Sequence, residues 1–235
     1  MLTNQLKSIV GIAKGMPNTG NHKTDLEEFY APQSESYDYF RKRLLRGRRE
    51  MLSYLCLIGG QKVVEVGCGT GQNLDYLDPS LIRSLERLDL VDLCPSLVKK
   101  AKERARSFGN IKVVETNGCE FDPGTSVDRV YFSYSLTMIP DWVKAIRNAY
   151  RMLRPGGLIG IVDFCPEPVT AKQPGDGFSS KFWKKWFAHD GVFLERSHFD
   201  FLNGMFEAIE VREGRNSIPL LPFLHAHYYI FIGRK

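Results

Sequence analysis

Short apolar runs alternate with helical patterns through most of the chain, without an internal repeat or a low-complexity segment. This alternation is typical of βαβ units, in which helices cover a parallel sheet. The apolar runs predict five parallel strands at Lys62–Val66, Leu88–Val91, Ile111–Glu115, Arg129–Ser133 and Leu158–Asp163. The helical patterns lie at Gly71–Leu77, Pro95–Phe108 and Asp141–Leu153. Two further strands are expected near Ala208–Glu213 and His227–Ile232.

The remaining segments depart from this alternation. Residues 1–24 contain Gly, Asn, Thr and Pro around Met16–Asn21 and are expected to form a loosely held arm. Residues 25–58 carry a long, Arg-dense helical pattern that predicts a lid, and residues 165–204 form an aromatic and basic insertion on the substrate side. The Arg-Pro-Gly-Gly sequence at 154–157 predicts a helix stop and a sharp turn. We therefore expect one domain over residues 25–235.

Composition narrows the function classes. A chain of 235 residues with 43% hydrophobic content can bury one large core. The net charge of +5 comes from scattered Lys and Arg, so nucleic acid is not an expected partner, whereas contact with an anionic membrane stays open. Five cysteines without a C-x-x-C pair argue against disulfides and against a metal site. No run approaches the ~20 apolar residues of a membrane span, so a reducing, cytoplasmic location is expected, either free or on the inner face of a membrane.

The strongest chemical signal is an apolar strand that runs into the glycine loop Gly67-Cys68-Gly69-Thr70-Gly71. Glycines let a backbone approach a ligand closely and adopt positive φ. Dinucleotide enzymes space these glycines as G-x-G-x-x-G, whereas here the third glycine comes one residue early. The spacing therefore disfavours NAD. A tight strand-to-helix turn without a ligand is the structural alternative.

This loop resembles the first motif of class I S-adenosylmethionine-dependent methyltransferases, and later segments extend the resemblance in order along the chain. They are Asp92 after the second strand, Thr116–Glu120 after the third, Phe132–Pro140 after the fourth and Arg151–Gly157 before the fifth. The resemblance implies a Rossmann-like α/β fold, a seven-stranded and mostly parallel sheet whose last strand is antiparallel, and S-adenosylmethionine as the cofactor.

The same resemblance assigns roles to these segments. The glycine loop would wrap the amino-acid end of the cofactor, Glu65 would orient amines and waters, and Asp92 would accept both ribose hydroxyls. Many relatives carry Asp where Asn117 stands, which weakens its expected adenine contact. The cofactor-binding residues predicted in this way are Tyr30, Arg41, Glu65, Gly67, Cys68, Gly69, Thr70, Gly71, Asp92, Leu93, Asn117, Gly118, Cys119 and Ser133.

Both ends of the chain resemble one subfamily, the bacterial diacylglyceryl-homoserine N-methyltransferases of betaine-lipid synthesis. The similar segments are Phe29–Gln33, Tyr37-Asp38, Arg41–Arg48, Leu221–Leu224 and Tyr228–Lys235. This resemblance implies methylation of the homoserine amine of a lipid headgroup to a trimethylated betaine. A Tyr-Asp-x-x-Arg opening also occurs in quinone and sterol methyltransferases. A quinone-like or other small-molecule acceptor, or a catalytically silent cofactor-binding module, therefore stays open.

An amine acceptor needs few catalytic groups. A quaternary ammonium is stabilised by aromatic faces, by roughly 0.5 to 2 kcal/mol each, and Tyr37 and Tyr134 are the predicted faces. His227 is the predicted base, with His225 as an alternative, although either could be structural. Arg41 and Arg46 are candidates for a carboxylate contact, the alternative being a solvated basic helix face.

Access to a lipid would require a membrane-facing element. Residues Phe178–Phe187 place aromatics, including Trp183 and Trp186, among lysines, as an interfacial helix does. The alternative is a lid helix packed on the core. Nucleic-acid methylation is not expected, because the base-amine motif of such enzymes is absent after the fourth strand.

Overall fold

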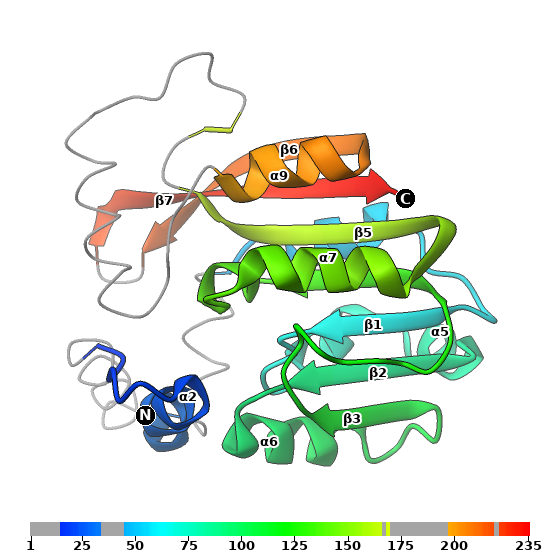
Figure 1. Ribbon diagram of the computed structural model, residues 1–235, viewed down its shortest axis with the longest axis horizontal. Coiled ribbons are helices and arrows are strands. Elements are labelled where there is room, and N and C mark those ends of the chain that lie inside the picture. The colour runs from blue at the N-terminus through cyan, green and yellow to red at the C-terminus, as the bar shows by residue number, and fades with distance from the viewer. Residues whose placement is uncertain (1–14, 34–44, 166–167, 170–196, 219–220) are drawn as a thin grey trace.

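A computed structural model describes residues 15–33, 45–165, 168–169, 197–218 and 221–235. Its centre is a seven-stranded sheet with the order β3-β2-β1-β4-β5-β7-β6 (Figure 1). The strands are β1 Lys62–Val66, β2 Arg87–Asp92, β3 Ile111–Glu115, β4 Val127–Ser133, β5 Leu153–Cys165, β6 Glu207–Ile218 and β7 Leu221–Arg234. All the apolar runs identified in the sequence are therefore strands.

Strand direction divides the sheet in two. Strands β1 to β5 pair in parallel, whereas β7 pairs antiparallel with both β5 and β6. The last strand in sequence thus lies between two earlier ones. This arrangement confirms the predicted mixed, mostly parallel sheet.

Helices cover both faces of the sheet. They are α2 His22–Tyr30, α4 Arg48–Tyr54, α5 Pro79–Ser84, α6 Pro95–Ala105, α7 Trp142–Met152 and α9 Ser197–Met205. Short 3₁₀ turns lie at η1 Ala31–Gln33, η2 Gln72–Tyr76 and η3 Leu136–Met138. Helices α7 and α9 run along one face, which Figure 1 shows.

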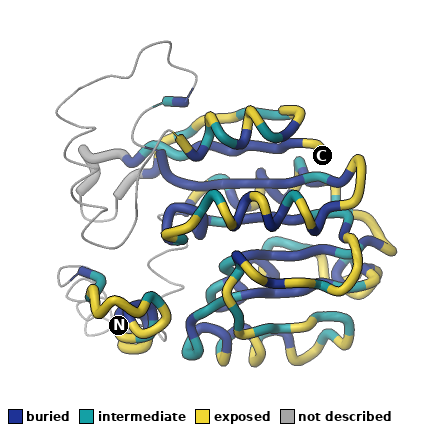
Figure 2. The backbone as a smooth tube through the Cα atoms, viewed as in Figure 1, coloured by how far each residue is buried: buried dark blue, intermediate teal, exposed yellow. Residues whose placement is uncertain are grey.

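The two faces bury separate cores because strand side chains alternate in direction. On β1, Val63 packs with residues of α4 and α6, whereas Val64 and Val66 pack with residues of α7 and α9. Figure 2 shows the central strands almost wholly buried and the outer helix faces exposed. A buried sheet of this kind holds the strand ends, and the loops that follow them, in fixed positions.

The helix starts follow from local sequence. Asn21 caps α2 by accepting from the amides of Lys23 and Thr24, and Asp141 caps α7 by accepting from the Lys144 amide at 3.1 Å. Helix α2 therefore begins inside the segment expected to be a loose arm. Helix α4 starts only after Gly47, whose φ of 78° interrupts the helical pattern expected over 25–58.

The Arg-Pro-Gly-Gly turn is present but differs in form from the expectation. Helix α7 ends at Met152 and β5 begins at the next residue. In the pairing of β4 with β5, Val127 lies opposite Leu153 and Arg129 lies opposite Leu158. An advance of two residues along β4 thus corresponds to an advance of five residues along β5. Residues 154–157 are therefore a bulge within the strand, which re-aligns β5 beside β4.

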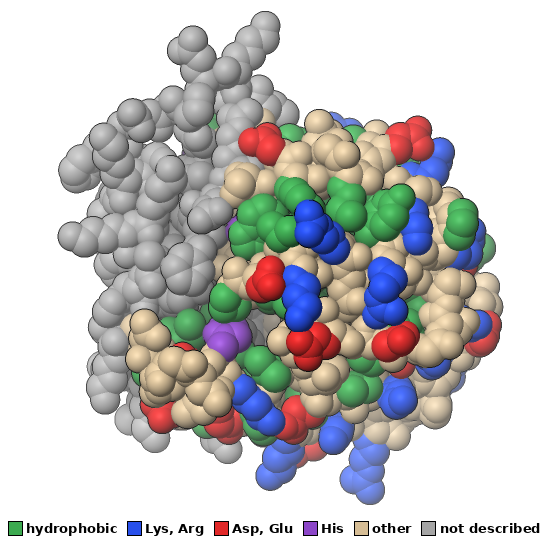
Figure 3. All heavy atoms as spheres, in the orientation of Figure 1, with side chains coloured by type: hydrophobic (Ala, Val, Ile, Leu, Met, Phe, Trp, Pro, Cys, Tyr) green, Lys and Arg blue, Asp and Glu red, His purple; other side chains and the backbone are tan. Residues whose placement is uncertain are grey.

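Charges of both signs are mixed on the surface. Figure 3 shows Lys and Arg beside Asp and Glu over the face that carries α7. Pairs such as Lys144 with Glu120, at 2.8 Å, account for part of this pattern. None of the helices in the described part of the chain has the length and apolar character that crossing a bilayer requires.

Candidate functional site

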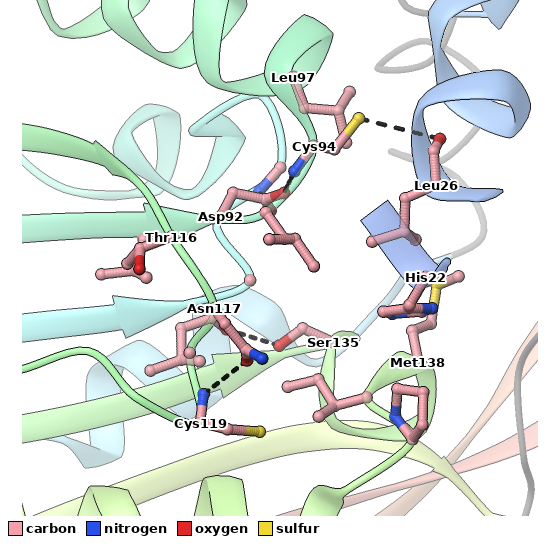
Figure 4. A pocket seen from close by; sticks show the side chains of 18 of the residues that line it. His22, Leu26, Asp92, Cys94, Leu97, Thr116, Asn117, Cys119, Ser135 and Met138 are labelled. Carbon is pink, nitrogen blue, oxygen red and sulfur yellow. Dashed lines mark hydrogen bonds between the residues drawn. The ribbon is translucent and has the colours of Figure 1, made fainter. Parts of the chain in front are cut away.

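A cavity of about 240 Å³ opens at the carboxyl ends of β1 to β4. Here the order of the parallel strands reverses, since β2 and β3 extend to one side of β1 and β4 and β5 to the other. Ligands of open α/β sheets bind at this kind of position. Figure 4 shows Asp92 and Asn117 on one side of the cavity and His22, Leu26 and Met138 on the other.

The glycine loop forms the floor of this cavity. Gly67 and Cys68 donate their amides to the Val91 carbonyl at 2.8 and 3.0 Å, which fixes the loop to β2. A Cβ on Gly67 would lie 2.3 Å from that of Ser135, so only glycine fits there. Gly69 has a φ of 56° and faces open space, which leaves its backbone accessible to a ligand.

Asp92 lies where the sequence placed it, at the end of β2. Its two carboxylate oxygens accept from the amides of Gly69, at 2.7 Å, and Cys94, at 2.9 Å. Each oxygen keeps further acceptor capacity, so the carboxylate can still receive two hydroxyls. Burial raises the pKa of Asp92, and the amide hydrogen bonds oppose that rise.

The loop after β3 forms the adjacent wall. Asn117 accepts from the Cys119 amide at 2.9 Å, and Asn148 of α7 donates to the Gly118 carbonyl at 2.9 Å. A Cβ on Gly118 would lie 2.4 Å from Val66, so this loop is pressed against β1. Burial raises the pKa of Cys119 to about 11, which keeps the thiol neutral and a poor nucleophile.

A second cavity of about 50 Å³ adjoins the first, because Gly67, Gly69 and Tyr134 line both. Glu65 is fully buried at its base and accepts from Asn73 at 2.6 Å and Tyr131 at 2.8 Å. Burial raises the pKa of Glu65 to about 7, against the opposing effect of these hydrogen bonds.

Arg48 gives this smaller cavity a positive charge. Its Nε donates to the Leu45 carbonyl at 3.1 Å and its Nη1 to Gln72 at 2.8 Å. Its Nη2 is buried without a hydrogen-bond partner among the described residues, as are Ser133 Oγ and Asn73 Oδ1. Unpaired buried polar atoms are costly, so this group is suited to a polar ligand.

Tyr134 stands between the two cavities in a left-handed conformation, with φ of 55°. Its hydroxyl donates to the Arg46 carbonyl at 2.7 Å and accepts from Asn216 at 3.1 Å. Its ring packs on Phe164, with 4.7 Å between ring centroids. Burial raises its pKa well above the ordinary value, so Tyr134 acts as a neutral wall.

Helix α2 covers the larger cavity from the far side. Tyr30 donates to the Met138 sulfur at 2.9 Å, and Glu27 accepts from the Ser96 amide at 2.9 Å. Lys23 pairs with Glu115 at 2.6 Å. These contacts hold α2 against β3, α6 and η3, around the rim of the cavity.

The structure groups most of the predicted residues. The larger cavity is lined by Tyr30, Gly67, Gly69, Asp92, Leu93, Asn117, Gly118, Cys119 and Tyr134. The smaller one adds Glu65, Cys68, Thr70 and Ser133. Gly71 lines neither, and instead caps η2 with a φ of 71°. Tyr37 and Arg41 lie outside the described residues, and so does the Phe178–Phe187 segment.

Other candidates lie elsewhere. His227 pairs with Cys165 across β5 and β7 and is not among the residues that line either cavity, and the side chain of His225 is not described. The Arg46 side chain is exposed, and its backbone amide and carbonyl bond Asn216 and Tyr134.

Two residues near the cavities were missed by sequence reasoning. His22 lines the larger cavity, and Arg48 lines the smaller one. Met138, which belongs to the Phe132–Pro140 segment identified in the sequence, also lines the larger cavity. Burial lowers the pKa of His22, although Asp25 and the Met138 carbonyl oppose that effect. The N-cap signal of Asn21 would have placed His22 on a helix, and the helix start after Gly47 would have singled out Arg48.

These groups fit an adenosyl amino acid. The larger cavity combines apolar walls with a carboxylate, and the smaller one holds an unpaired guanidinium N–H beside a buried carboxylate. A ligand with a hydroxylated sugar and a zwitterionic end complements both. The open backbone at Gly69 lines both cavities and so connects them.

Comparisons with known proteins agree with this geometry. Residues 64–161 match a family model described as a methyltransferase domain. The ubiquinone/menaquinone biosynthesis C-methyltransferase UbiE of Escherichia coli K12 is 30% identical over 109 residues, 45% of this chain and 43% of that protein. The match thus spans less than half the length of the curated relatives.

Solved structures show the same fold. The N-methyltransferase NodS from Bradyrhizobium japonicum, in complex with S-adenosylhomocysteine, has a TM-score of 0.64 at 19% identity, covering 92% of this chain and 98% of NodS. Phosphoethanolamine N-methyltransferase 2 from Haemonchus contortus, with phosphomonomethylethanolamine and S-adenosylhomocysteine, has a TM-score of 0.70 at 15% identity, covering 93% of this chain and 61% of that one.

Residues 64–161 are therefore similar to a methyltransferase domain, and the chain has the Rossmann-like methyltransferase fold that the sequence predicted.

Proposed function

We propose that this chain is an S-adenosylmethionine-dependent methyltransferase. The observation that carries the proposal is the pair of adjoining cavities at the strand ends, one with Asp92 and the other with Arg48, whose Nη2 has no hydrogen-bond partner among the described residues. In this proposal Asp92 holds the ribose hydroxyls and the loop around Asn117 holds the adenine. Arg48 and Glu65 hold the carboxylate and the ammonium of the amino-acid end.

The cofactor supplies a methyl group on a sulfonium, which is transferred by in-line displacement. The residues of the chain then need to orient the acceptor and exclude water. In this proposal helix α2 covers the larger cavity, and Tyr134 forms part of the wall of both cavities. An ammonium acceptor must also lose a proton before attack.

The acceptor we propose is the amine of a lipid headgroup, with diacylglyceryl-homoserine as the specific substrate. The resemblance of both ends of the chain to betaine-lipid N-methyltransferases supports it. Two structural neighbours are named as N-methyltransferases, which is compatible with an amine acceptor. The aromatic rings of Tyr30 and Tyr134 in the cavity wall are suited to a methylated ammonium.

A quinone-like acceptor is the second candidate. The match to UbiE, a C-methyltransferase of ubiquinone and menaquinone synthesis, is the observation that favours it. Carbon methylation of a quinol would leave an uncharged ring product, whereas amine methylation leaves a fixed positive charge. The two acceptors are therefore distinguishable by their products.

Mass spectrometry with a deuterated methyl donor tests the proposal. The purified chain is incubated with dispersed diacylglyceryl-homoserine or with a demethylated quinol, and each product is measured. Successive labelled methyl groups on the homoserine amine are expected. Labelling of the quinol alone would replace the lipid acceptor, and failure to bind S-adenosylhomocysteine would overturn the methyltransferase proposal itself.

A further inference from the structure

A buried asparagine links the β6–β7 hairpin to the site. Asn216 lies on β6 with none of its surface exposed. Its Oδ1 accepts from the Arg46 amide at 3.3 Å, and its Nδ2 donates to the Tyr134 hydroxyl at 3.1 Å. Because that hydroxyl donates to the Arg46 carbonyl at 2.7 Å, the three residues form a closed hydrogen-bonded ring.

This ring fixes the backbone that precedes α4. Gly47 follows with a φ of 78°, and a Cβ there would lie 2.5 Å from the Tyr228 ring of β7. The hairpin is therefore seated directly against this turn. The Arg48 Nε then bonds the Leu45 carbonyl of the same turn, so the direction of the guanidinium depends on the turn.

We propose that Asn216 is a positioning residue for the carboxylate end of the cofactor. It acts through Arg46 and Tyr134 on the turn that aims Arg48 into the smaller cavity. The inference rests on the proposed function, because it assigns the Arg48 subsite to the methionyl carboxylate. Its consequence is that the hairpin controls affinity for the amino-acid half of the ligand and not for the adenosine half.

The alternative is that Asn216 merely satisfies buried polar groups. Its removal would then lower stability and weaken every ligand alike. Two ligands separate these cases, namely S-adenosylhomocysteine and 5′-methylthioadenosine. The second has the adenosine and the thioether of the first but lacks the amino-acid end.

Calorimetry on Asn216→Ala is the test. Affinity for S-adenosylhomocysteine should fall roughly tenfold, the scale of one lost polar contact, while that for methylthioadenosine stays within about twofold. If the alanine variant does not fold, Tyr134→Phe serves instead. It removes the hydroxyl that takes part in the hydrogen-bonded ring and should show the same selective loss of affinity for S-adenosylhomocysteine.

Asn110→Ala is the matched control. The Asn110 amide donates to the Ile82 and Leu85 carbonyls at 2.7 and 2.8 Å, away from both cavities. This variant loses two hydrogen bonds without touching the ring, so its affinity for both ligands should not change.

Coupling to Arg48 completes the test. In an Arg48→Met background, adding Asn216→Ala should change S-adenosylhomocysteine affinity by less than about twofold, because the residue through which it acts is gone. Equal loss of both ligands, or full additivity with Arg48→Met, would overturn the inference. If the unmodified chain bound neither ligand, the proposed function would fail instead.

Discussion

At the residue scale, Glu65 and Asp163 are both carboxylates buried in the sheet, and they have different surroundings. Glu65 on β1 faces the smaller cavity and shares it with Arg48. Asp163 on β5 accepts from the Thr137 hydroxyl at 2.7 Å and from the Phe164 amide at 2.8 Å. Burial raises the pKa of Asp163 to about 6. Asp163 therefore anchors the η3 turn, whereas Glu65 is placed to meet a ligand.

The pKa of Glu65 predicts a pH-dependent stability. Its folded pKa of about 7 lies above its ordinary 4.5, so the folded state keeps a proton that the unfolded state loses between these values. The stability of the unmodified chain should therefore fall with rising pH relative to Glu65→Gln. The unfolding free energy of the unmodified chain minus that of Glu65→Gln should fall by about 1 to 3 kcal/mol across this window.

Urea unfolding of both chains at about pH 5 and about pH 8, without ligand, measures this difference. Asp163 is present in both chains, so its own titration cancels in the comparison. If the difference in unfolding free energy between the two chains did not change across that range, Glu65 would ionise normally in the folded chain.

Asp92 gives a prediction for cofactor binding. Asp92→Ala should weaken S-adenosylhomocysteine binding by about 1 to 3 kcal/mol, the usual scale for leaving polar partners unsatisfied. The Gly69 and Cys94 amides also lose their acceptor in this variant. Part of the lost binding free energy therefore comes from a less well held glycine loop. Calorimetry with NAD as a second ligand should show no binding to the unmodified chain. Unchanged affinity for S-adenosylhomocysteine would remove Asp92 from the site.

At the scale of elements, one of the contacts that hold α2 to the rest of the fold is an unusual helix cap. The N-cap residue of α6, Cys94, makes no side-chain capping bond. Glu27 of α2 takes that role by accepting from the Ser96 amide. Burial opposes ionisation of Glu27, but the hydrogen bonds from Ser96 and Cys94 lower its pKa overall. The lid and α6 are thus coupled through a carboxylate at a helix N-terminus.

Weakening this cap should loosen the lid. Glu27→Gln is expected to lower stability by about 0.5 to 1.5 kcal/mol and to speed release of S-adenosylhomocysteine, because α2 covers the cavity. Thermal melts and stopped-flow dissociation measure the two effects. Glu28→Gln is the matched control, since Glu28 is exposed on the same helix. Identical release rates for the two variants would mean that the cap does not hold the lid.

The elements differ in how well the sequence predicted them. Strands were predictable because each carries an apolar run bounded by polar residues. Helix α5 was missed because it is short and buries only Ile82, so it shows no periodicity. Helix α9 was missed because only His198 and Leu202 are buried along it and it follows an aromatic and basic stretch.

The same limit applies to the site. Gly67, Gly69 and Asp92 were predictable because each lies at a strand end or in the loop just after one, where local sequence determines position. Arg48 depends on a turn that Asn216 holds from a distant strand, and no local pattern reports such a contact.

At the scale of the whole molecule, a lipid acceptor predicts contact with a bilayer. The residues Trp183 and Trp186, in the aromatic and basic sequence, are expected to enter the acyl boundary, with lysines drawn to anionic headgroups at about 1 kcal/mol each. Replacing both tryptophans by serine should reduce co-sedimentation with anionic vesicles while S-adenosylhomocysteine affinity stays within about threefold.

A core-packing role for these tryptophans gives a different result. The double variant would then melt at a much lower temperature and lose cofactor binding together with activity. A thermal melt beside the vesicle assay separates the two cases. Undiminished vesicle binding by a well-folded variant would contradict the interfacial interpretation.

The position of β7 has a consequence for synthesis of the chain on the ribosome. Strand β6 emerges first but reaches the rest of the sheet only through β7, which pairs with β5 on its other side. Until residues 221–234 have been made, the edge of β5 stays unpaired and β6 has no neighbour. Open strand edges are sites of aggregation, and distant pairings form slowly. The nascent chain is therefore exposed to aggregation through these strand edges until β7 has been made.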